Sequence, residues 1–213
     1  MDCLTAFETS RFVRVAVSPR RHTGQVSALP NELLGQRLRL SRATLDDVDE
    51  VLAAIVASFA ELHTWMTWAE TMPTRESLAA FASESLTRFD SDDKWSYWMR
   101  ELDGGLLVGS AALTRRGGVD ELEIGYWVRT DRTGRGYATE AASVLTSAAF
   151  NSDLGVATVK ISMDRANSAS AAVPQKLGFE RDVEYERDIL TPGHSGQGVA
   201  WVVRRDNWQN RTR

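Results

Sequence analysis

Two spacings of apolar residues alternate along this chain and predict a mixed domain of strands and helices. Strand-like runs, in which every second residue tends to be apolar, cover residues 38–41, 94–102, 106–114, 120–129, 157–163, 179–190 and 198–205. Apolar residues three or four positions apart predict helices over residues 45–62, 74–89, 137–150 and about 168–177. This order predicts an α/β (α+β) fold with one largely antiparallel sheet and helices on both faces.

Local turn and cap signals divide these elements. Thr74 is a predicted helix N-cap. The apolar face of the helix that follows is formed by Leu78, Phe81, Leu86 and Phe89. Asp103-Gly104-Gly105 joins two strand-like runs and predicts a hairpin. The aromatic segment 63–68 is predicted to be a loop or short turn.

Residues 1–31 differ from the rest of the chain in charge. This segment carries a net charge of +2, whereas the whole chain carries −4. Proline and glycine interrupt it, and chain ends are often loose. We therefore expect residues 1–31 to be a poorly ordered N-terminal extension, with at most a short strand at 12–17. The folded domain is expected to occupy residues 32–210.

The composition excludes several classes of protein. A net charge of −4 disfavours a general nucleic-acid binder, which would show a basic face. Cys3 is the single cysteine, so no intrachain disulfide can form and a cytoplasmic location is expected. The three histidines are far apart in the sequence, so no metal site is predicted. No apolar run approaches the roughly 20 residues of a membrane span, so no membrane partner is expected.

The segment Arg132–Glu140 is the most informative for chemistry. It follows a strand, contains Gly134 and Gly136, and opens a helix. Glycines let the backbone turn tightly, and free amides at a helix start form a phosphate site. A P-loop would need lysine where Tyr137 follows Gly136, and a dinucleotide fingerprint would need glycine or alanine at Thr139. Both of those nucleotide-binding alternatives are therefore disfavoured, although such a loop alone can be a simple helix start.

A second motif covers Asn167–Phe179, between a strand and a glycine stop. Pro174 cannot donate a hydrogen bond to the carbonyl of Ser170, which loosens the first turn of the helix. Asn167 and Ser170 are thereby left with polar groups beside the end of the preceding strand. Their alternative role is that of helix caps.

Together these motifs resemble the Gcn5-related N-acetyltransferase (GNAT) superfamily. The sequences Glu-Ile-Gly-Tyr-Trp-Val at 123–128 and Gly-Arg-Gly-Tyr-Ala-Thr-Glu-Ala at 134–141 resemble its ribosomal-protein branch, the RimJ/RimL type, as does the ending Pro-Gly-His-Ser-Gly at 192–196. The resemblance covers about residues 34–208. The Gln/Arg position of the family motif falls on Thr133, one place after Arg132, which departs from the pattern.

The resemblance implies a mixed, mostly antiparallel sheet that splays open between strands 120–129 and 157–163, with acetyl-CoA as co-substrate in the gap. Backbone amides from Gly134 to Ala138 would bind the pyrophosphate. The pantetheine arm would pair with the strand end near Trp127. The implied cofactor-binding residues are Trp127, Val128, Arg129, Gly134, Arg135, Gly136, Tyr137, Ala138, Thr139 and Asn167.

Acyl transfer also needs a base for the amine, an acid for the thiolate and a donor for the carbonyl oxygen. Glu123 is predicted to be the base, acting through water; it would otherwise orient the amine or pair with an arginine such as Arg115. Ser170 is predicted to protonate the thiolate, with a helix cap as the alternative. The amide of Val128 is a candidate oxyanion donor. His194 is either a second base or a solvated loop residue.

His63, Trp65 and Trp68 are predicted to line the acceptor site, with core packing as the alternative. The expected partner is an amine acceptor, either a protein N-terminus or a small molecule, and a homodimer is left open. The leading interpretation is thus an acetyl-CoA-dependent N-acetyltransferase. The alternatives are an enzyme for an antibiotic, polyamine or amino acid, and a non-catalytic acyl-CoA-binding module.

Overall fold

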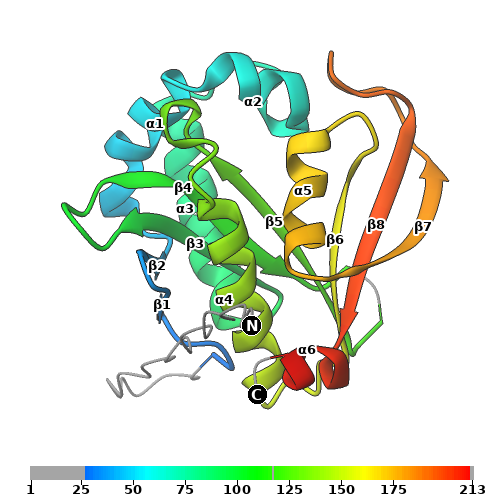
Figure 1. Cartoon of the computed structure of the whole chain (residues 1–213). Helices are drawn as coiled ribbons and strands as arrows, with labels where there is room; N and C mark the ends of the chain where they lie inside the picture. The colour runs from blue at the N-terminus through cyan, green and yellow to red at the C-terminus, as the bar shows by residue number, and fades with distance from the viewer. Residues whose placement is uncertain (1–26, 117, 212–213) are drawn as a thin grey trace, which may run out of the picture.

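A computed structural model describes residues 27–116 and 118–211. Eight strands of these residues form one sheet in the order β1-β2-β3-β4-β5-β6-β8-β7 (Figure 1). The strands are β1 (Glu32–Leu34), β2 (Leu38–Arg42), β3 (Lys94–Glu101), β4 (Leu107–Thr114), β5 (Glu121–Val128), β6 (Thr158–Asp164), β7 (Glu180–Glu186) and β8 (Gln197–Arg204). The helices are α1 (Val48–Val56), α2 (Phe59–Trp65), α3 (Arg75–Asp90), α4 (Tyr137–Asn151), α5 (Ser168–Lys176) and α6 (Arg205–Arg211), with 3-10 turns at Leu45–Asp47, Thr67–Ala69 and Thr130–Arg132.

The sheet is antiparallel at every junction except one. β5 and β6 are parallel and pair only from Glu121, opposite Thr158, to Glu123, opposite Lys160. Beyond Glu123 the two strands separate, so the β6-facing edge of Ile124–Val128 carries no strand partner. The predicted fold class and the predicted splay between these strands are therefore confirmed.

Helices cover both faces of the sheet, with α1 to α3 on one side and α4 and α5 on the other (Figure 1). The strand β3 shows the consequence, because Trp95 and Trp98 point to opposite faces and both are buried. Trp95 belongs to the core that includes Leu145 of α4, whereas Trp98 packs in a second core with residues of α1 and α3. A central strand covered on both faces buries residues of both parities.

The folded domain begins before residue 32, which corrects the expected boundary of the extension. Leu29 is only 2% exposed and belongs to the main core. Ser27 Oγ donates to Asp92 at 2.9 Å and accepts from Trp95 Nε1 at 2.9 Å. The carbonyl of Pro30 accepts from the Tyr97 hydroxyl. Residues 1–26, including the predicted strand at 12–17, lie outside the described residues.

The first predicted helix, 45–62, is broken into a 3-10 turn, α1 and α2. The break falls at Ser58, whose backbone is not helical and whose Oγ accepts a hydrogen bond from the amide of Thr130 at 3.1 Å. A contact with a distant loop thus ends a helix that the local apolar spacing would continue.

Other elements differ from their predictions in extent. The buried face of α3 is Leu78, Ala82, Ser85 and Phe89, while Phe81 is exposed. The segment 63–65 lies in α2 instead of a loop. β7 ends at Glu186, and α6 and the short β1 were not predicted. No helix in the described ranges is long and apolar enough to cross a membrane.

Candidate acyl-transfer site

The loop before α4 has the geometry of an anion site. Gly134 and Gly136 have φ angles of +73° and +82°, a region that side-chain-bearing residues rarely adopt. The first bond of α4 runs from the Glu140 amide to the Gly136 carbonyl at 3.0 Å. The three preceding amides, at Tyr137, Ala138 and Thr139, therefore have no helical acceptor. Free amides and the helix dipole both favour a phosphate at this point.

Glu140 and Arg37, which sequence reasoning did not select, fix the conformation of this loop through hydrogen bonds to each other and to its backbone. The Glu140 carboxylate accepts from the amides of Arg37 at 2.7 Å and Leu38 at 3.0 Å, and from Arg37 Nε at 3.0 Å. Arg37 Nη1 donates to the carbonyl of Arg135 at 2.9 Å. The motif Gly134–Ala141 contained Glu140, but its partner could not be found without the fold.

The neighbouring predicted cofactor residues present mainly backbone to this site. Arg129 donates its amide to Val108 at 2.8 Å, and its guanidinium pairs with Asp131. The Tyr137 hydroxyl donates to Glu101 at 2.5 Å, so its side chain is directed into the protein. Trp127 and Val128 pair with β4 on one edge, opposite Ser110 and Gly109. Their other edge faces the gap.

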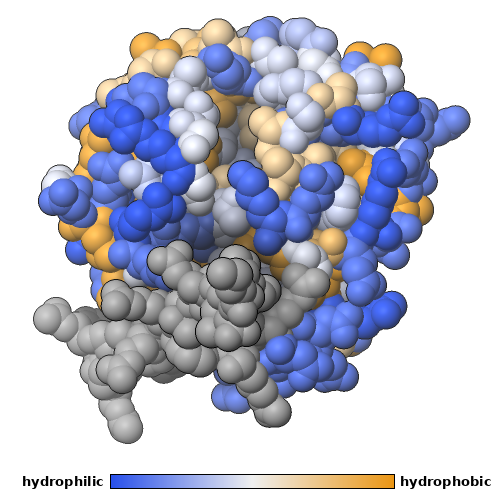
Figure 2. Space-filling model, viewed as in Figure 1, coloured by the Kyte–Doolittle hydropathy of each residue, from blue (hydrophilic) through white to orange (hydrophobic). Residues whose placement is uncertain are grey.

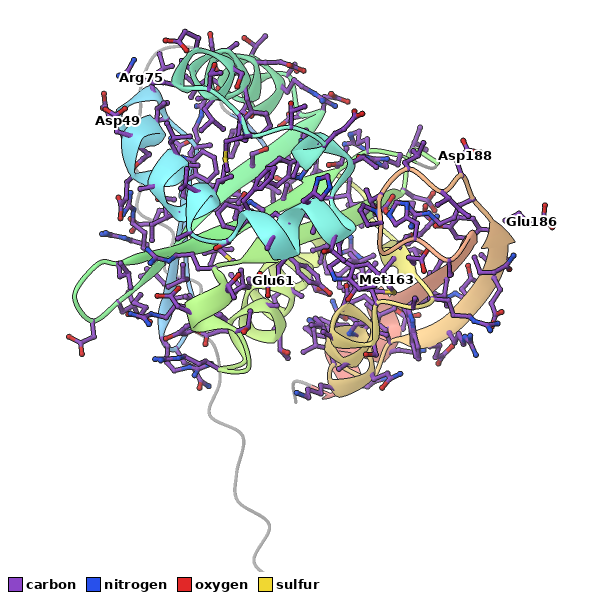
Figure 3. All side chains as sticks on the ribbon, turned by 90° about the horizontal axis from the view of Figure 1, so that it is seen from above. Asp49, Glu61, Arg75, Met163, Glu186 and Asp188 are labelled. Atoms are coloured by element: carbon purple, nitrogen blue, oxygen red, sulfur yellow. The ribbon has the colours of Figure 1, made fainter. Side chains whose placement is uncertain are left out.

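A pocket of about 170 Å³ occupies the gap between β5 and β6. Figure 2 shows the hollow on this face of the molecule. Met163 of β6, one of the residues that line this pocket, is labelled in Figure 3 and lies inside the molecule. The lining residues are Trp65, Met66, Ile124, Gly125, Tyr126, Ile161, Ser162, Met163, Asp164, Asn167, Ser170, Arg187 and His194. The splay brings the two sequence motifs, at 123–128 and 167–179, to one cavity.

Ser170 lies in this pocket beside Tyr126, a residue not predicted as part of the site. The two hydroxyl oxygens are 3.0 Å apart, and the Tyr126 hydroxyl also donates to the Ser170 carbonyl at 3.1 Å. Burial raises the pKa of Tyr126 to about 12, so the phenol stays protonated at neutral pH. Asn167 Oδ1 accepts from the Ser170 amide at 3.0 Å, which is the helix-cap contact. Asn167 thus caps α5 while also lining the pocket.

His194 is buried in the pocket wall, so the expectation of a solvated loop histidine is wrong. The residue is 7% exposed, and its Nδ1 accepts a hydrogen bond from the amide of Leu190 at 3.3 Å. Nearby Asp164 is 3% exposed and accepts hydrogen bonds from Ala166 and Ser195. Burial would raise the pKa of Asp164, but these hydrogen bonds and the charge of Arg187 outweigh it and leave the pKa below its ordinary value.

Glu123 does not line this pocket. It is the last residue of β5 that pairs with β6, and its carboxylate is 20% exposed. An oxygen of Glu123 lies 3.8 Å from Arg116 Nε, whereas Glu121 pairs with Lys160 at 3.3 Å. The structure thus separates Glu123 from Ser170, and an arginine partner is present, although it is Arg116 and not Arg115. Its role as base remains a prediction.

Of the three predicted acceptor residues, Trp65 alone lines the pocket. His63 donates from Nδ1 to the carbonyl of Ala69 at 2.9 Å and stacks on Phe59, so it holds the end of α2. Trp68 is half exposed and lies against Trp127, with ring centroids 6.4 Å apart. The structure therefore splits this group into one pocket residue, one residue that fixes the local fold, and one packing residue.

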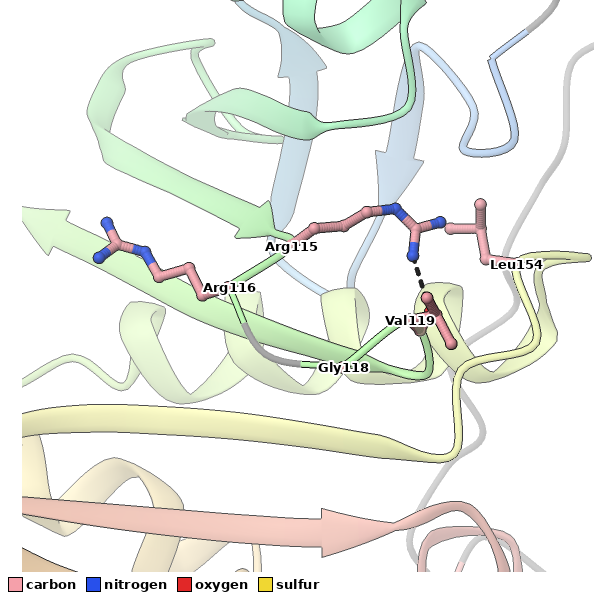
Figure 4. A pocket seen from close by; sticks show the side chains of 5 residues that line it. All are labelled: Arg115, Arg116, Gly118, Val119 and Leu154. Carbon is pink, nitrogen blue, oxygen red and sulfur yellow. Dashed lines mark hydrogen bonds between the residues drawn. The ribbon is translucent and has the colours of Figure 1, made fainter.

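A second hollow, of about 540 Å³, lies beside the turn between β4 and β5 (Figure 4). Its walls include Arg115 and Arg116, but Arg115 already donates to the carbonyls of Asp92 and Val119. The hollow is open and contains no residue of the two motifs in its lining, although its wall residue Arg116 pairs with Glu123. Within residues 27–116 and 118–211, no three histidine, cysteine or acidic side chains gather as a metal site.

The splayed sheet, the glycine loop and the hydroxyl in the gap define an acyltransferase that uses an acyl-CoA. Residues 37–180 match the acetyltransferase (GNAT) domain, which covers more than half of the chain. The chain belongs to the GNAT acetyltransferase family, and acetyl-CoA is its co-substrate. The predicted family and the predicted co-substrate are thereby confirmed.

Solved structures with the same fold include several acetyltransferases at low sequence identity. RimJ of Mycobacterium smegmatis, in complex with a CoA disulfide, has a TM-score of 0.70 and 19% identity, covering 79% of this chain and 82% of that one. RimL, the ribosomal L7/L12 α-N-protein acetyltransferase in complex with CoA, has a TM-score of 0.73 and 15% identity (79% and 94%). The microcin C7 self-immunity acetyltransferase MccE, in complex with acetyl-CoA and AMP, has a TM-score of 0.74 and 16% identity (84% and 98%). No curated protein matches this chain significantly.

Proposed function

We propose that this protein transfers the acetyl group of acetyl-CoA to a primary amine. The observation that carries the proposal is the pocket between β5 and β6, which residues of the 123–128 and 167–179 motifs line together. The free amides at the start of α4 follow β5 in the chain. The unpaired edge of β5 has the free backbone groups that an extended pantetheine arm can pair with.

The residues of the gap have the chemistry that the reaction needs. The amides of Tyr137 to Thr139 would bind pyrophosphate oxygens, and the amide of Val128 would stabilise the oxyanion at the thioester carbonyl. Ser170 would donate its hydroxyl proton to the leaving thiolate. Glu123 would remove the ammonium proton through water. Tyr126 would set the direction of the Ser170 hydroxyl, because the two oxygens are 3.0 Å apart.

The RimJ/RimL type of acceptor, a protein N-terminus, is supported by the Glu-Ile-Gly-Tyr-Trp motif and by the fold shared with RimL and RimJ. MccE, which shares the fold to the same degree, favours a small-molecule acceptor as the second candidate. A cytoplasmic location stays a prediction and rests on the single cysteine.

Replacement of Gly136 tests the cofactor part of the proposal. Gly136→Val would force a β-branched residue to a φ of +82° and place its Cβ 3.4 Å from Arg37 Nη2. We expect CoA affinity, measured by calorimetry, to fall at least about tenfold, equivalent to about 1.4 kcal/mol. Gly105→Val, at the β3–β4 hairpin with φ +68° and open space around it, is the matched control.

The transfer itself is tested by thiol release from acetyl-CoA against a panel of N-terminal peptides and small amines. Amine-dependent thiol release that is lost in Gly136→Val supports the proposal. A folded Gly136→Val protein with unchanged CoA affinity contradicts the loop assignment. CoA binding without transfer to any amine favours the non-catalytic acyl-CoA-binding module.

A further inference from the structure

Part of the pocket wall, Arg187 and His194, belongs to the connection from β7 to β8, and this connection is fixed to α2. The Gly193 amide donates to the Thr64 carbonyl at 2.9 Å, and Thr191 Oγ1 donates to the same carbonyl at 2.8 Å. A Cβ on Gly193 would lie 2.6 Å from that oxygen, so a glycine is required for this approach. The connection therefore holds Arg187 and His194 as a preformed wall.

The hydrogen bond at Nδ1 determines which proton His194 presents. The Leu190 amide can only donate, so Nδ1 must be the unprotonated nitrogen of a neutral imidazole. The ring proton is then on Nε2. Since His194 lines the pocket and its Nδ1 is engaged by Leu190, the group it has available there is the Nε2–H donor, which argues against the second-base alternative.

The Asp164 carboxylate, although it lines the pocket, is poorly placed to bind a cation there. Its Oδ1 accepts from the Ala166 amide and from Ser195 Oγ, and its Oδ2 accepts from the Ser195 amide. The lowered pKa keeps the group ionised at neutral pH. Its oxygens are engaged in holding the connection in place, so they are poorly available to an ammonium group of the acceptor.

Arg187 supplies positive charge to the same wall. Within residues 27–116 and 118–211 its guanidinium forms no ion pair shorter than 4 Å, although its charge reaches the buried Asp164 and lowers the pKa of that carboxyl. Its acidic chain neighbours, Glu186 and Asp188, lie at the outer edge of the molecule in Figure 3. Arg187 itself lines the pocket. The acceptor side of the pocket therefore offers donors: a guanidinium and the Nε2–H of His194.

We propose that Arg187 and His194 bind a carboxylate that the acceptor carries close to its amine. This inference rests on the proposed N-acetyltransferase function and names the acceptor class for the same pocket. Guanidinium groups bind carboxylates through charge-assisted, often bidentate, hydrogen bonds. The carboxylate is either the α-carboxylate of a free amino acid or the side chain of an acidic residue near a peptide N-terminus. A polyamine would place a second cation beside Arg187 and is disfavoured.

Paired acceptors that differ only in the carboxylate test this assignment. The pairs are alanine with alaninamide, and the dipeptide amides Ala-Glu and Ala-Gln, with spermidine as the polyamine. One carboxylate acceptor should have a kcat/KM at least about tenfold above that of its neutral partner. The pair that shows this difference tells whether the bound carboxylate is the α-carboxylate of an amino acid or the side chain of an acidic residue. Arg187→Gln should raise KM for that acceptor at least about tenfold with kcat little changed, because uniform binding is lost.

Three further variants separate recognition from folding. Arg187→Lys retains the charge and should lose less affinity than Arg187→Gln. His194→Gln retains an N–H near the position of Nε2 and should exceed His194→Leu in affinity. Arg181→Gln on β7, which removes a surface partner of Glu184 and lies outside the pocket lining, should leave every KM unchanged.

The assignment is overturned if the neutral partners and spermidine are used as well as the carboxylates, or if Arg187→Gln raises KM equally for both members of a pair. Calorimetry on the CoA-bound protein, with N-acetylalanine, N-acetylalaninamide and the acetylated forms of both dipeptide amides, separates this failure from that of the proposed function. Absence of transfer with intact CoA binding contradicts only the proposed function. Binding of a carboxylate probe that depends on Arg187 still supports the subsite, and its absence refutes it.

Discussion

Arg37 and Glu140 are 103 residues apart in the chain, yet the Glu140 carboxylate accepts two hydrogen bonds from Arg37 and a third from the next residue, Leu38. Glu140 lies in the first turn of α4, where a negative charge also stabilises the helix dipole. Since Arg37 holds the Arg135 carbonyl as well, the pair fixes the glycine loop against the edge of the sheet.

Removal of this contact is expected to weaken CoA binding without touching the cofactor. Glu140→Ala leaves the amides of Arg37 and Leu38 without their acceptor. Leu38 is buried, and a buried donor that loses its partner typically costs about 1–3 kcal/mol. We expect a lower Tm and a CoA affinity reduced by about three- to tenfold, measured by calorimetry. Glu84→Ala, on the exposed face of α3, is the control. Unchanged CoA affinity in a folded Glu140→Ala protein would show that the loop holds its shape alone.

Two truncations test where the domain begins. Deletion of residues 2–26 should leave turnover within about threefold, which is under 1 kcal/mol in the barrier. Deletion of residues 2–30 also removes the buried Leu29 and the Ser27 contacts, so unfolding should occur at least about 4 °C lower. Equal Tm values for the two truncations would mean that residues 27–30 add nothing to stability. A hundredfold loss of turnover on removing 2–26 would assign that segment to the site.

The elements that the sequence predicts well are those whose signals are local. The helix from Tyr137, the capped helix after Thr74 and the hairpin at Gly104-Gly105 all follow the predicted positions closely. Their apolar spacing, caps and turns lie within a few residues of one another. The break at Ser58 could not be predicted in this way, because the hydrogen bond from Thr130 comes from 72 residues away.

The same distinction separates the parts of the site. The glycine loop was predicted because positive φ angles require glycine at two fixed positions. Tyr126 was missed because its partner Ser170 is 44 residues away and only the splay brings them together. For His194 the alternative of a solvated loop residue is wrong, because the hydrogen bonds of its turn to the distant Thr64 bury it.

Tyr126→Phe should reveal whether the phenol positions Ser170. We expect kcat to fall about tenfold with the KM for acetyl-CoA little changed, because the phenol is expected to act only through Ser170. Ser170→Ala should cost about a hundredfold or more if Ser170 is the acid. The double variant should then be no slower than Ser170→Ala, since residues that act as a unit are not additive. Tyr185→Phe, exposed on β7, is the control, and additive losses would mean that the two hydroxyls act independently.

The Asp164 carboxylate should make the stability of the folded protein depend on pH in the acidic range. Because its folded-state pKa is below the ordinary value of 3.8, its contribution is complete above that value and is lost as the pH falls through the folded-state pKa. Asp164→Asn should lower Tm at pH 7, and the difference from the unmodified protein should shrink as the pH falls below 3.8. Thermal unfolding followed from pH 7 to pH 2 measures this. The exposed Asp153→Asn is the control for the loss of a surface carboxylate, and a constant gap for Asp164→Asn would contradict an ionised carboxylate.

The position of Glu123 restricts how it could act as the base. Its carboxylate lies at the end of the β5–β6 pairing, outside the pocket lining and 3.8 Å from Arg116. A base at that place can reach an amine in the gap only through water. Gly125, the next residue on the same side of the strand, has no side chain that would block such a path.

Glu123→Gln is therefore expected to keep CoA affinity while lowering kcat by about 10²–10⁴, the usual effect of a positioned base. The loss should shrink as the pH rises, because more of the amine is then already neutral. Glu121→Gln, whose carboxylate pairs with Lys160, should cost much less. Steady-state kinetics from pH 6 to pH 10 decide between the roles.

A raised KM for the amine with kcat unchanged makes Glu123 a ligand of the ammonium. No change in either parameter removes it from the reaction, and since His194 presents an N–H donor, water held by backbone carbonyls in the gap would then have to accept the proton.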